Sequence, residues 1–246
     1  MREPGFGIDL AGFSTGKSGF ARAQADDEGH IVVSVWDKHP LKTKYTGGRS
    51  LIDATRSLQR LIGACMVRGP VAVDIPIDLQ GLPNSPTSDH IWGATKRPVD
   101  QALGGMPPFA DRIGGPVVRF MHLGLQSALG ERLFETYPAQ SLRELGLAPT
   151  GYKNQTAKME DGEWVGGRLA ALLTSLSVVA EPGETLDDDE FDAIICALAV
   201  AGDLDYPARR SRLDRQIDAK LGNANRHVQA SIRVERLDEL ISPYFS

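Results

Sequence analysis

The chain has few cysteines and no long apolar run, and each of these absences excludes a class of protein. Cys65 and Cys196 are too few for a disulfide framework or a zinc site. Because both lie in apolar helical patterns, we expect buried free thiols. No apolar segment reaches the roughly 18 residues of a membrane span, and no signal-peptide pattern follows Met1. These features predict a cytoplasmic protein with no membrane contact.

Positive charge is also scarce. The chain has 27 Lys and Arg against 32 Asp and Glu, a formal net charge of -5. This balance argues against a protein that coats nucleic acid through bulk charge, but not against one that meets phosphates through metal ions. No repeat or low-complexity tract appears, and no obligate protein partner is evident. With 246 residues, 41% of them hydrophobic, we expect a single domain over residues 1–246.

Three acidic residues stand inside apolar segments of strand length. Asp9 lies in residues 6–12, Asp74 in residues 71–76 and Glu135 in residues 133–138. An ionised, unpaired carboxylate in a protein interior costs several kcal/mol, so something must compensate each of them. A bound metal ion is a natural candidate, and the repeated pattern predicts one shared site.

The first third of the chain predicts the arrangement of these strands. Residues 6–10, 20–25 and 31–36 indicate three antiparallel strands, and residues 50–62 have helical spacing. That helix would cross over to a strand at 71–74 parallel to the first. Asp9 and Asp74 would then end adjacent parallel strands, where open α/β sheets place their sites.

The turn after the first strand contains Gly16-Lys17-Ser18, which resembles the end of a phosphate-binding loop. Ala11 stands where the full motif requires glycine, and the next segment alternates like a strand. We therefore expect a tight turn, with Ser14 and Lys17 near the site.

Residues 83–116 are rich in proline, glycine and polar side chains. A stretch this long without clear periodicity predicts an insertion or lid over the site. Lys96 and Arg97 within it could meet a phosphate or could be solvated.

The second half of the chain reads as mainly helical. Residues 166–179 and 187–201 have strongly apolar helical patterns, and residues 205–246 predict a helical extension. In the extension, Arg209 to Arg215 mix with acids, which is typical of a solvated face. Asp189 and Asp192 are three residues apart and share a helix face. Ala193, Ala197 and Ala201 repeat every four residues, so that helix can approach the sheet closely.

These acids predict a divalent-metal site. No Ser-His-Asp or Cys-His arrangement accompanies them, and hard carboxylate oxygens suit Mg²⁺ or Mn²⁺. Two such ions roughly 4 Å apart can activate a water and stabilise the leaving oxygen of a phosphodiester. The candidate catalytic and metal-binding residues are Asp9, Asp74, Glu135, Asp189 and Asp192.

Four segments resemble the motifs of domain-of-unknown-function family 429, which is described as predicted nucleases of the ribonuclease H-like fold. They are Gly7-Ile8-Asp9, Ala72-Val73-Asp74-Ile75-Pro76-Ile77-Asp78-Leu79, Phe134-Glu135-Thr136-Tyr137-Pro138 and Asp189-Glu190-Phe191-Asp192-Ala193. The resemblance implies that Asp9, Asp74 and Glu135 are strand ligands and that Asp189 or Asp192 is the helix ligand. A lysine-containing motif of that family has only a loose counterpart in Tyr152-Lys153 and Lys158.

The expectation is an α/β, ribonuclease H-like domain with a mixed five-stranded sheet, its first three strands antiparallel, flanked by helices. The expected function is divalent-metal-dependent hydrolysis of nucleic acid. A nucleotide-binding phosphotransferase of the actin-like superfamily is one alternative, and a non-catalytic binding protein of the same fold is another.

Overall fold

The computed structural model describes most of the chain, and the account below concerns that part. The described residues are 3–11, 18–28, 30–36, 51–79, 82, 95–103, 105–110, 112–201 and 232–236. Three predicted features lie outside the described residues. They are residues 12–17 of the glycine-containing turn, residues 83–94 of the predicted insertion, and the Arg209 to Arg215 cluster.

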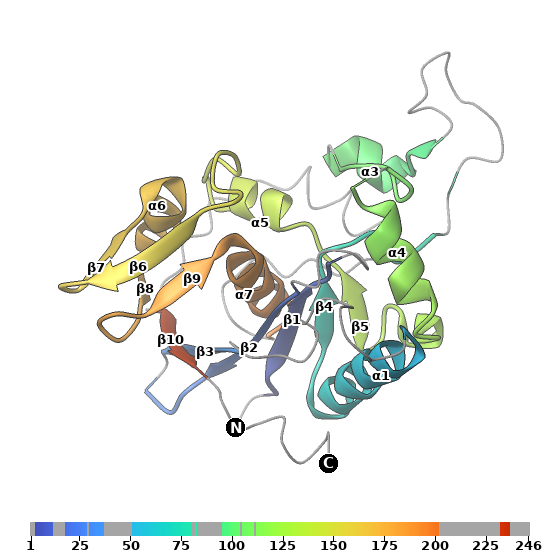
Figure 1. Ribbon diagram of the computed structural model, residues 1–246, viewed down its shortest axis with the longest axis horizontal. Helices are drawn as coiled ribbons and strands as arrows, with labels where there is room; N and C mark the ends of the chain where they lie inside the picture. The colour runs from blue at the N-terminus through green and yellow to red at the C-terminus, as the bar shows by residue number, and fades with distance from the viewer. Residues whose placement is uncertain are drawn as a thin grey trace.

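Three strands open the chain, and helices are interspersed with the remaining strands (Figure 1). The strands are β1 (Gly5–Asp9), β2 (Gly19–Ala25), β3 (Ile31–Val35), β4 (Val71–Val73), β5 (Leu133–Glu135), β6 (Thr156–Glu160), β7 (Glu163–Val165), β8 (Val178–Val179), β9 (Thr185–Asp187) and β10 (Ile232–Arg236). The helices are α1 (Leu51–Arg68), α3 (Pro98–Leu103), α4 (Gly114–Met121), the 3₁₀ turn η2 (Gln126–Ala128), α5 (Pro138–Glu144), α6 (Gly167–Ser175) and α7 (Asp188–Val200).

The central sheet is mixed and has the strand order β5-β4-β1-β2-β3-β10-β8. Strands β1, β2 and β3 are antiparallel neighbours, while β4 is parallel to β1 and β5 is parallel to β4. The predicted α/β class, the mixed sheet and the three antiparallel opening strands are therefore confirmed. The predicted number of strands is wrong, because the sheet has seven rather than five.

The two additional strands come from segments whose patterns were interpreted as helical. The helix predicted over 166–179 ends at Ser175, and β8 follows it, pairing in parallel with β10. The predicted C-terminal helical extension is wrong at residues 232–236, where β10 pairs in parallel with β3. Ile232 and Val234 are buried and Arg233 is exposed, so this segment has the alternation of a strand.

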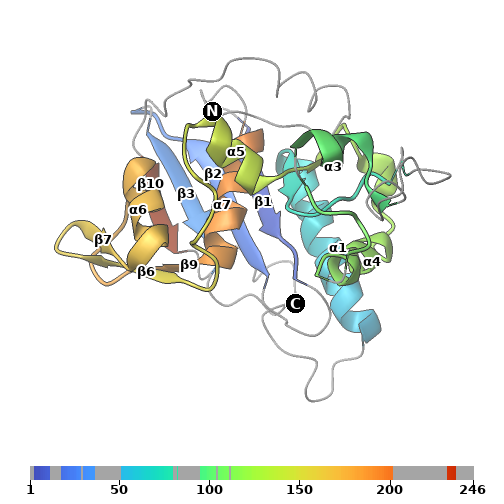
Figure 2. The same cartoon turned by 90° about the horizontal axis from the view of Figure 1, so that it is seen from above.

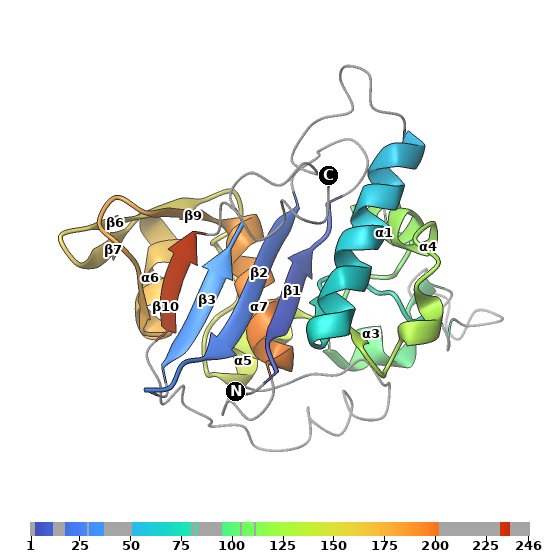
Figure 3. The ribbon, with the colours of Figure 1, turned by 90° about the horizontal axis from the view of Figure 1, so that it is seen from below.

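Helices cover both faces of the sheet (Figure 3). Helix α7 packs on β1 and β2, whereas α1 lies on the opposite face. Alternate residues of β1 serve the two layers: Phe6 and Ile8 join the core formed with α1 and α4, while Gly5 and Gly7 lie under α7. This alternation decides which side chains can reach a site beside α7.

Helix α7 passes unusually close to the sheet because small residues face each other. A Cβ atom on Gly7 would lie 1.9 Å from the carbonyl oxygen of Ala193, and one on Gly5 would lie 2.5 Å from that of Ala197. At Gly19 on β2, a Cβ would lie 2.0 Å from the carbonyl oxygen of Asp189. The close approach expected from the alanine repeat is confirmed, and it brings the first turn of α7 to the C-terminal end of β1.

A second, three-stranded sheet of order β7-β6-β9 packs with α6 beside the central sheet (Figure 2). Asp161 and Gly162 both have positive φ, 49° and 85°, as a two-residue turn between β6 and β7 requires. The Trp164 side chain is buried and its Nε1 donates to the carbonyl oxygen of Val178, 2.7 Å away. The small sheet is thereby tied to the edge strand β8 of the central one.

The structure also bears on the predictions about the two cysteines and about membrane spans. Cys65 and Cys196 are both free and buried, as predicted. In the ranges described above, no helix combines the length and the apolar character that a membrane span requires.

Candidate metal centre

The alternation of side chains along the parallel strands determines which acids reach α7. Gly7, Ala72 and Phe134 stand side by side in β1, β4 and β5 and face that helix. Two residues further along, the same face carries Asp9, Asp74 and Thr136. The hydroxyl of Thr136 lies 3.0 Å from the Sγ atom of Cys196 on α7, which confirms this orientation for β5.

Three carboxylates meet at this end of the sheet. Asp9, Asp74 and Asp192 each offer an oxygen, and these oxygens lie within 4.8 Å of one another. Asp192 comes from the second turn of α7 and is fully buried, whereas Asp9 and Asp74 are partly buried. Two strand ends and one helix thus converge on a single small volume, which we call the carboxylate centre.

Charge in the carboxylate centre is poorly compensated by the described residues. Burial raises the pKa of Asp74 to about 8, and the neighbouring charge of Asp192 adds to the effect. Burial, Asp74 and Asp192 together raise the pKa of Asp9 well above its usual value. The pKa of Asp192 is raised by burial too, although Lys153 and the Tyr152 hydroxyl partly offset the shift. Without a further cation, the three groups therefore resist ionising together.

The loop before β6 supplies the polar partners of Asp192. The hydroxyl of Tyr152 donates to Asp192 Oδ1 across 2.7 Å, and Lys153 Nζ makes an ion pair with Asp192 Oδ2. Burial lowers the pKa of Lys153, but Asp192 and Asp9 outweigh it and raise the pKa above its ordinary value. Lys153 is therefore a charged neighbour of the carboxylate centre.

Asp189 lies beside the carboxylate centre but outside the group of three. It is half-buried in the first turn of α7, next to Asp187 and Asp188. Burial and the charges of Asp187 and Asp188 raise the pKa of Asp189 to about 6. Asp187 itself is the N-cap of α7 and forms a capping box with Glu190, so it has a structural role.

Glu135 does not join the other predicted ligands. It pairs with Val73, and Val73 belongs to the core on the α1 side of the sheet. The Glu135 side chain therefore leaves the sheet on the face opposite Asp74, one pleat position from the orientation that the prediction required. The structure therefore corrects the prediction that Glu135 is a ligand together with Asp9 and Asp74. Thr136 stands at the place on the α7 face that was expected for Glu135.

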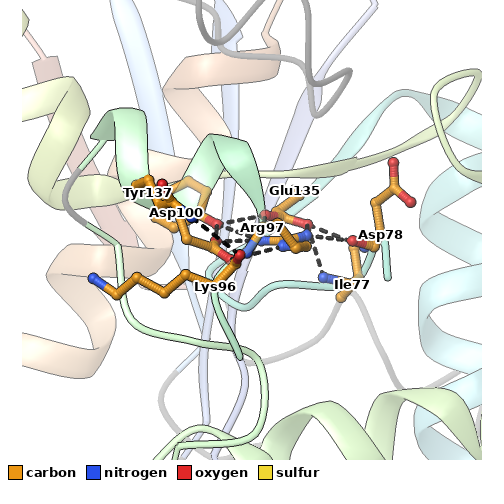
Figure 4. A network of polar contacts seen from close by, with 8 residues as sticks. Ile77, Asp78, Lys96, Arg97, Asp100, Glu135 and Tyr137 are labelled. Atoms are coloured by element: carbon orange, nitrogen blue, oxygen red, sulfur yellow. Dashed lines mark hydrogen bonds and ion pairs between the residues drawn. The ribbon is translucent and has the colours of Figure 1, made fainter. Parts of the chain in front are cut away.

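On that opposite face, Glu135 is fully buried and has several hydrogen-bond donors (Figure 4). Its Oε2 accepts from the main-chain N–H groups of Ile77 and Asp78 at 2.8 and 3.0 Å, and from Arg97 Nη1 at 2.9 Å. Its Oε1 accepts from Arg97 Nη2 at 2.6 Å and lies 2.7 Å from the Tyr137 hydroxyl. The carboxylate of Glu135 is thus satisfied by the protein itself.

Arg97 is neither a phosphate contact nor a solvated residue, contrary to both expectations. Its side chain is only 1% exposed and binds Asp100 through two nitrogens, at 3.0 and 2.7 Å, as well as Glu135. It also donates to the carbonyl oxygen of Asp78. Figure 4 shows the Lys96 side chain pointing away from this network. Arg97 thereby fastens the start of α3 to the segment that follows Asp74.

One family comparison bears on this site. Residues 116–205 match the model of a family described as "Protein of unknown function (DUF429)". The predicted family is confirmed over this span. The DUF429 match runs from α4 to the end of α7 and so includes Asp189 and Asp192, while Asp9 and Asp74 precede it. The description of the family carries no activity. No match is found among the curated proteins or among the solved structures.

The sequence prediction missed the contacts of Tyr152 and Lys153 with Asp192. Both residues stand in a polar loop, 40 and 39 positions from Asp192 in the chain. Local spacing carries no signal for such a contact. The one signal in the sequence was the family resemblance, in which Tyr152-Lys153 is a loose counterpart of a lysine-containing motif.

A second acidic group lies in the turn between β2 and β3, at the opposite end of the strands from the carboxylate centre. Asp26, Glu28 and His30 offer possible ligand atoms within 4.8 Å of one another. The Asp26 carboxylate accepts the main-chain N–H groups of Glu28 and His30 at 3.0 and 2.8 Å. These are the bonds of a side-chain-supported turn, which accounts for the arrangement.

Proposed function

We propose that this protein is a divalent-metal-dependent phosphodiester hydrolase that acts on nucleic acid. The observation that carries the proposal is the convergence of Asp9, Asp74 and Asp192, whose carboxylate oxygens lie within 4.8 Å of one another. Three hard oxygen donors in one partly buried volume suit Mg²⁺ or Mn²⁺. Ions held there would activate a water and stabilise the leaving oxygen of a phosphodiester.

The residues fit such an ion in charge as well as in donor type. The raised pKa values of Asp9 and Asp74 reflect burial and the repulsion of neighbouring carboxylates, which Lys153 offsets only in part. A divalent cation would favour the ionised form of each carboxyl group. Asp9 and Asp74 are partly rather than fully buried, as entry of an ion from solvent would require. Asp189, half-buried at the edge, would add a further carboxylate on the same side.

The arrangement of the strands supports the ribonuclease H-like part of the proposal. Five of the seven strands follow the order β5-β4-β1-β2-β3, with β2 antiparallel to both neighbours. This is the mixed sheet that the family resemblance implies, with one acid at the end of the first strand. Strands β10 and β8 extend it beyond β3.

Glu135 has a supporting role in the proposed enzyme. It holds the N–H groups of Ile77 and Asp78, which follow Asp74 by three and four residues. Arg97 holds the carbonyl oxygen of Asp78 as well. The network would therefore position the segment from which the Asp74 carboxylate projects.

The test is cleavage of a panel of single- and double-stranded DNA and RNA, with Mg²⁺ or Mn²⁺ and with EDTA. We expect metal-dependent cleavage by the wild type and a loss of about 100-fold or more in Asp9→Asn and Asp192→Asn, because each removes a charged ligand. Glu160→Gln, a change at an exposed residue of β6, is the control. Cleavage that persists at the wild-type rate in Asp9→Asn would contradict the proposal.

Two parallel measurements address the alternatives. Turnover of ATP without cleavage of nucleic acid would favour the phosphotransferase, which draws on the glycine-containing turn after β1. Calorimetry with Mn²⁺ separates an enzyme from a non-catalytic relative that has lost its metal. No binding by the wild type would leave only the fold.

A further inference from the structure

Lys153 binds an oxygen of Asp192, one of the three acids of the carboxylate centre. Its Nζ atom pairs with Asp192 Oδ2, while Oδ1 of the same carboxylate accepts the Tyr152 hydroxyl at 2.7 Å. Both oxygens of Asp192 are thus engaged by the loop before β6. An ion that binds Asp192 together with Asp9 and Asp74 has to share or replace one of these partners.

Of the two partners, only the lysine can leave without disturbing the packing. Tyr152 is 2% exposed, and its ring packs edge-on against Phe191 with the ring centres 5.4 Å apart. The Lys153 side chain is 52% exposed although it ends on a carboxylate that is 1% exposed. Its flexible stem reaches in from the surface, so rotation about side-chain bonds returns the ammonium to water.

The main chain around Lys153 is held in place on both sides. Tyr152 binds Asp192, and the N–H of Asn154 donates to the Asp188 carboxylate at 2.9 Å. Both contacts fasten the loop to the start of α7, along which it runs in Figure 2. Movement of the ammonium therefore needs no movement of the loop.

We propose that Lys153 is a tethered counter-ion, which binds Asp192 when no divalent ion is present and is displaced from it when the carboxylate centre takes up metal. The inference rests on the proposed function, since it assumes that the centre binds Mg²⁺ or Mn²⁺. Three ionised carboxylates would carry three negative charges, and Lys153 offsets one of them. The lysine thereby stabilises the metal-free protein and competes with the metal.

If Lys153 competes with the metal ion, its removal should raise metal affinity, whereas removal of a purely structural lysine should not. Lys153→Met keeps the length of the stem and removes the charge, so we expect lower thermal stability in EDTA together with tighter metal binding. The expected gain in affinity is about tenfold, because a like charge a few ångströms from the ion is removed. Lys158→Met is the matched control, since the Lys158 side chain is also 52% exposed but pairs with the exposed Glu160. Both quantities should stay at wild-type values in this control.

The experiment is calorimetric titration of the full chain with Mn²⁺, paired with thermal unfolding in EDTA. Equal or weaker metal binding by Lys153→Met than by the wild type would overturn the inference while leaving the proposed function intact. Absence of metal binding in the wild type would instead defeat the proposed function, and the inference with it.

A second measurement needs no variant. Amine acylation of the wild-type protein, read by peptide mass spectrometry, reports how accessible each lysine nitrogen is. We expect labelling of Lys153 to rise several-fold when Mn²⁺ is added, because the ammonium exchanges its carboxylate partner for water, while labelling of Lys158 stays constant. Bound metal without any increase at Lys153 would contradict displacement.

Discussion

The two faces of the sheet near the ends of β4 and β5 handle buried acids in opposite ways. On the α1 side, Glu135 and Asp100 share a guanidinium that is 1% exposed, and Glu135 also accepts two main-chain N–H groups. On the α7 side, Asp9, Asp74 and Asp192 share one half-exposed lysine. Acids on the first face are bound by a buried cation and by main-chain groups, whereas those on the second, which we call the unsatisfied face, share a lysine that can move into solvent.

This difference separates the acids that stabilise the fold from the candidate metal ligands better than burial does. Glu135 and Asp192 are both fully buried, and both belong to the sequence pattern that predicted a metal site. Only their partners distinguish them. The oxygens of Glu135 are held by a buried arginine and main-chain N–H groups, so this carboxylate has no coordination site to offer. One oxygen of Asp192 is held by a half-exposed lysine that can leave, and its neighbours have raised pKa values that favour a further cation.

The largest effect should come from breaking the satisfied face. Arg97→Met leaves Asp100 and Glu135 buried without their shared cation, and we expect a loss of about 3–5 kcal/mol in the free energy of unfolding. Urea denaturation measures it. Arg132→Met is the control, because the pair of Arg132 with Glu3 is about half exposed and should contribute under about 1 kcal/mol. Similar losses in both variants would mean that the network does not stabilise the fold.

The unsatisfied face should show its character in the pH dependence of stability. The pKa of Asp74 is about 8 in the folded protein against an ordinary value of 3.8, so the folded state holds this proton more tightly. The resulting stabilisation is complete below about pH 4 and is lost as the pH rises towards 8. In EDTA we expect the free energy of unfolding to fall by about 2–4 kcal/mol between pH 5 and pH 8.

Asp74→Asn supplies the matched comparison for this pH dependence, since it removes the titrating group and keeps its shape. Its unfolding free energy should vary less between pH 5 and pH 8 than that of the wild type. Saturating Mg²⁺ should also flatten the wild-type curve, because a bound cation favours the ionised carboxyl groups. A wild-type protein in EDTA that gains stability towards pH 8 would show that the centre is already neutralised.

Part of this arrangement was readable in the sequence. Asp9 and Asp74 could be placed because each ends an apolar strand, and a helix of crossover length separates the two strands. Asp192 could be placed because the repeat of Ala193 and Ala197 marks the face of α7 that meets the sheet. In each case a local pattern decides the orientation of the side chain.

Other parts of the structure depend on contacts between residues far apart in the chain, and some local signals in the sequence were overlooked. Lys153 reaches Asp192 through a loop whose course depends on tertiary packing, and the position of Arg97 depends on the insertion that carries it. The alternation of residues 232–236 was present in the sequence, yet the mixed charges of residues 205–246 suggested a solvated helix. The Asp161-Gly162 turn was present as well, but the small sheet around it was not predicted. The alternation of side chains between the two faces could have excluded Glu135 as a ligand, because the aligned positions of β4 and β5 pair it with Val73 rather than Asp74.

The same alternation of side chains yields the prediction with the smallest expected effect. Thr136 stands on the α7 face, where its hydroxyl contacts Cys196 Sγ at 3.0 Å, and both side chains are buried. Thr136→Val keeps the branched shape and removes one buried hydrogen-bonding group, so we expect a loss of about 1 kcal/mol in unfolding free energy. Affinity for Mn²⁺ should stay within about twofold of the wild type, since no charge of the carboxylate centre changes. A loss of metal binding would mean that Thr136, at the place expected for Glu135, takes part in coordination, and the set of three carboxylates would then be incomplete.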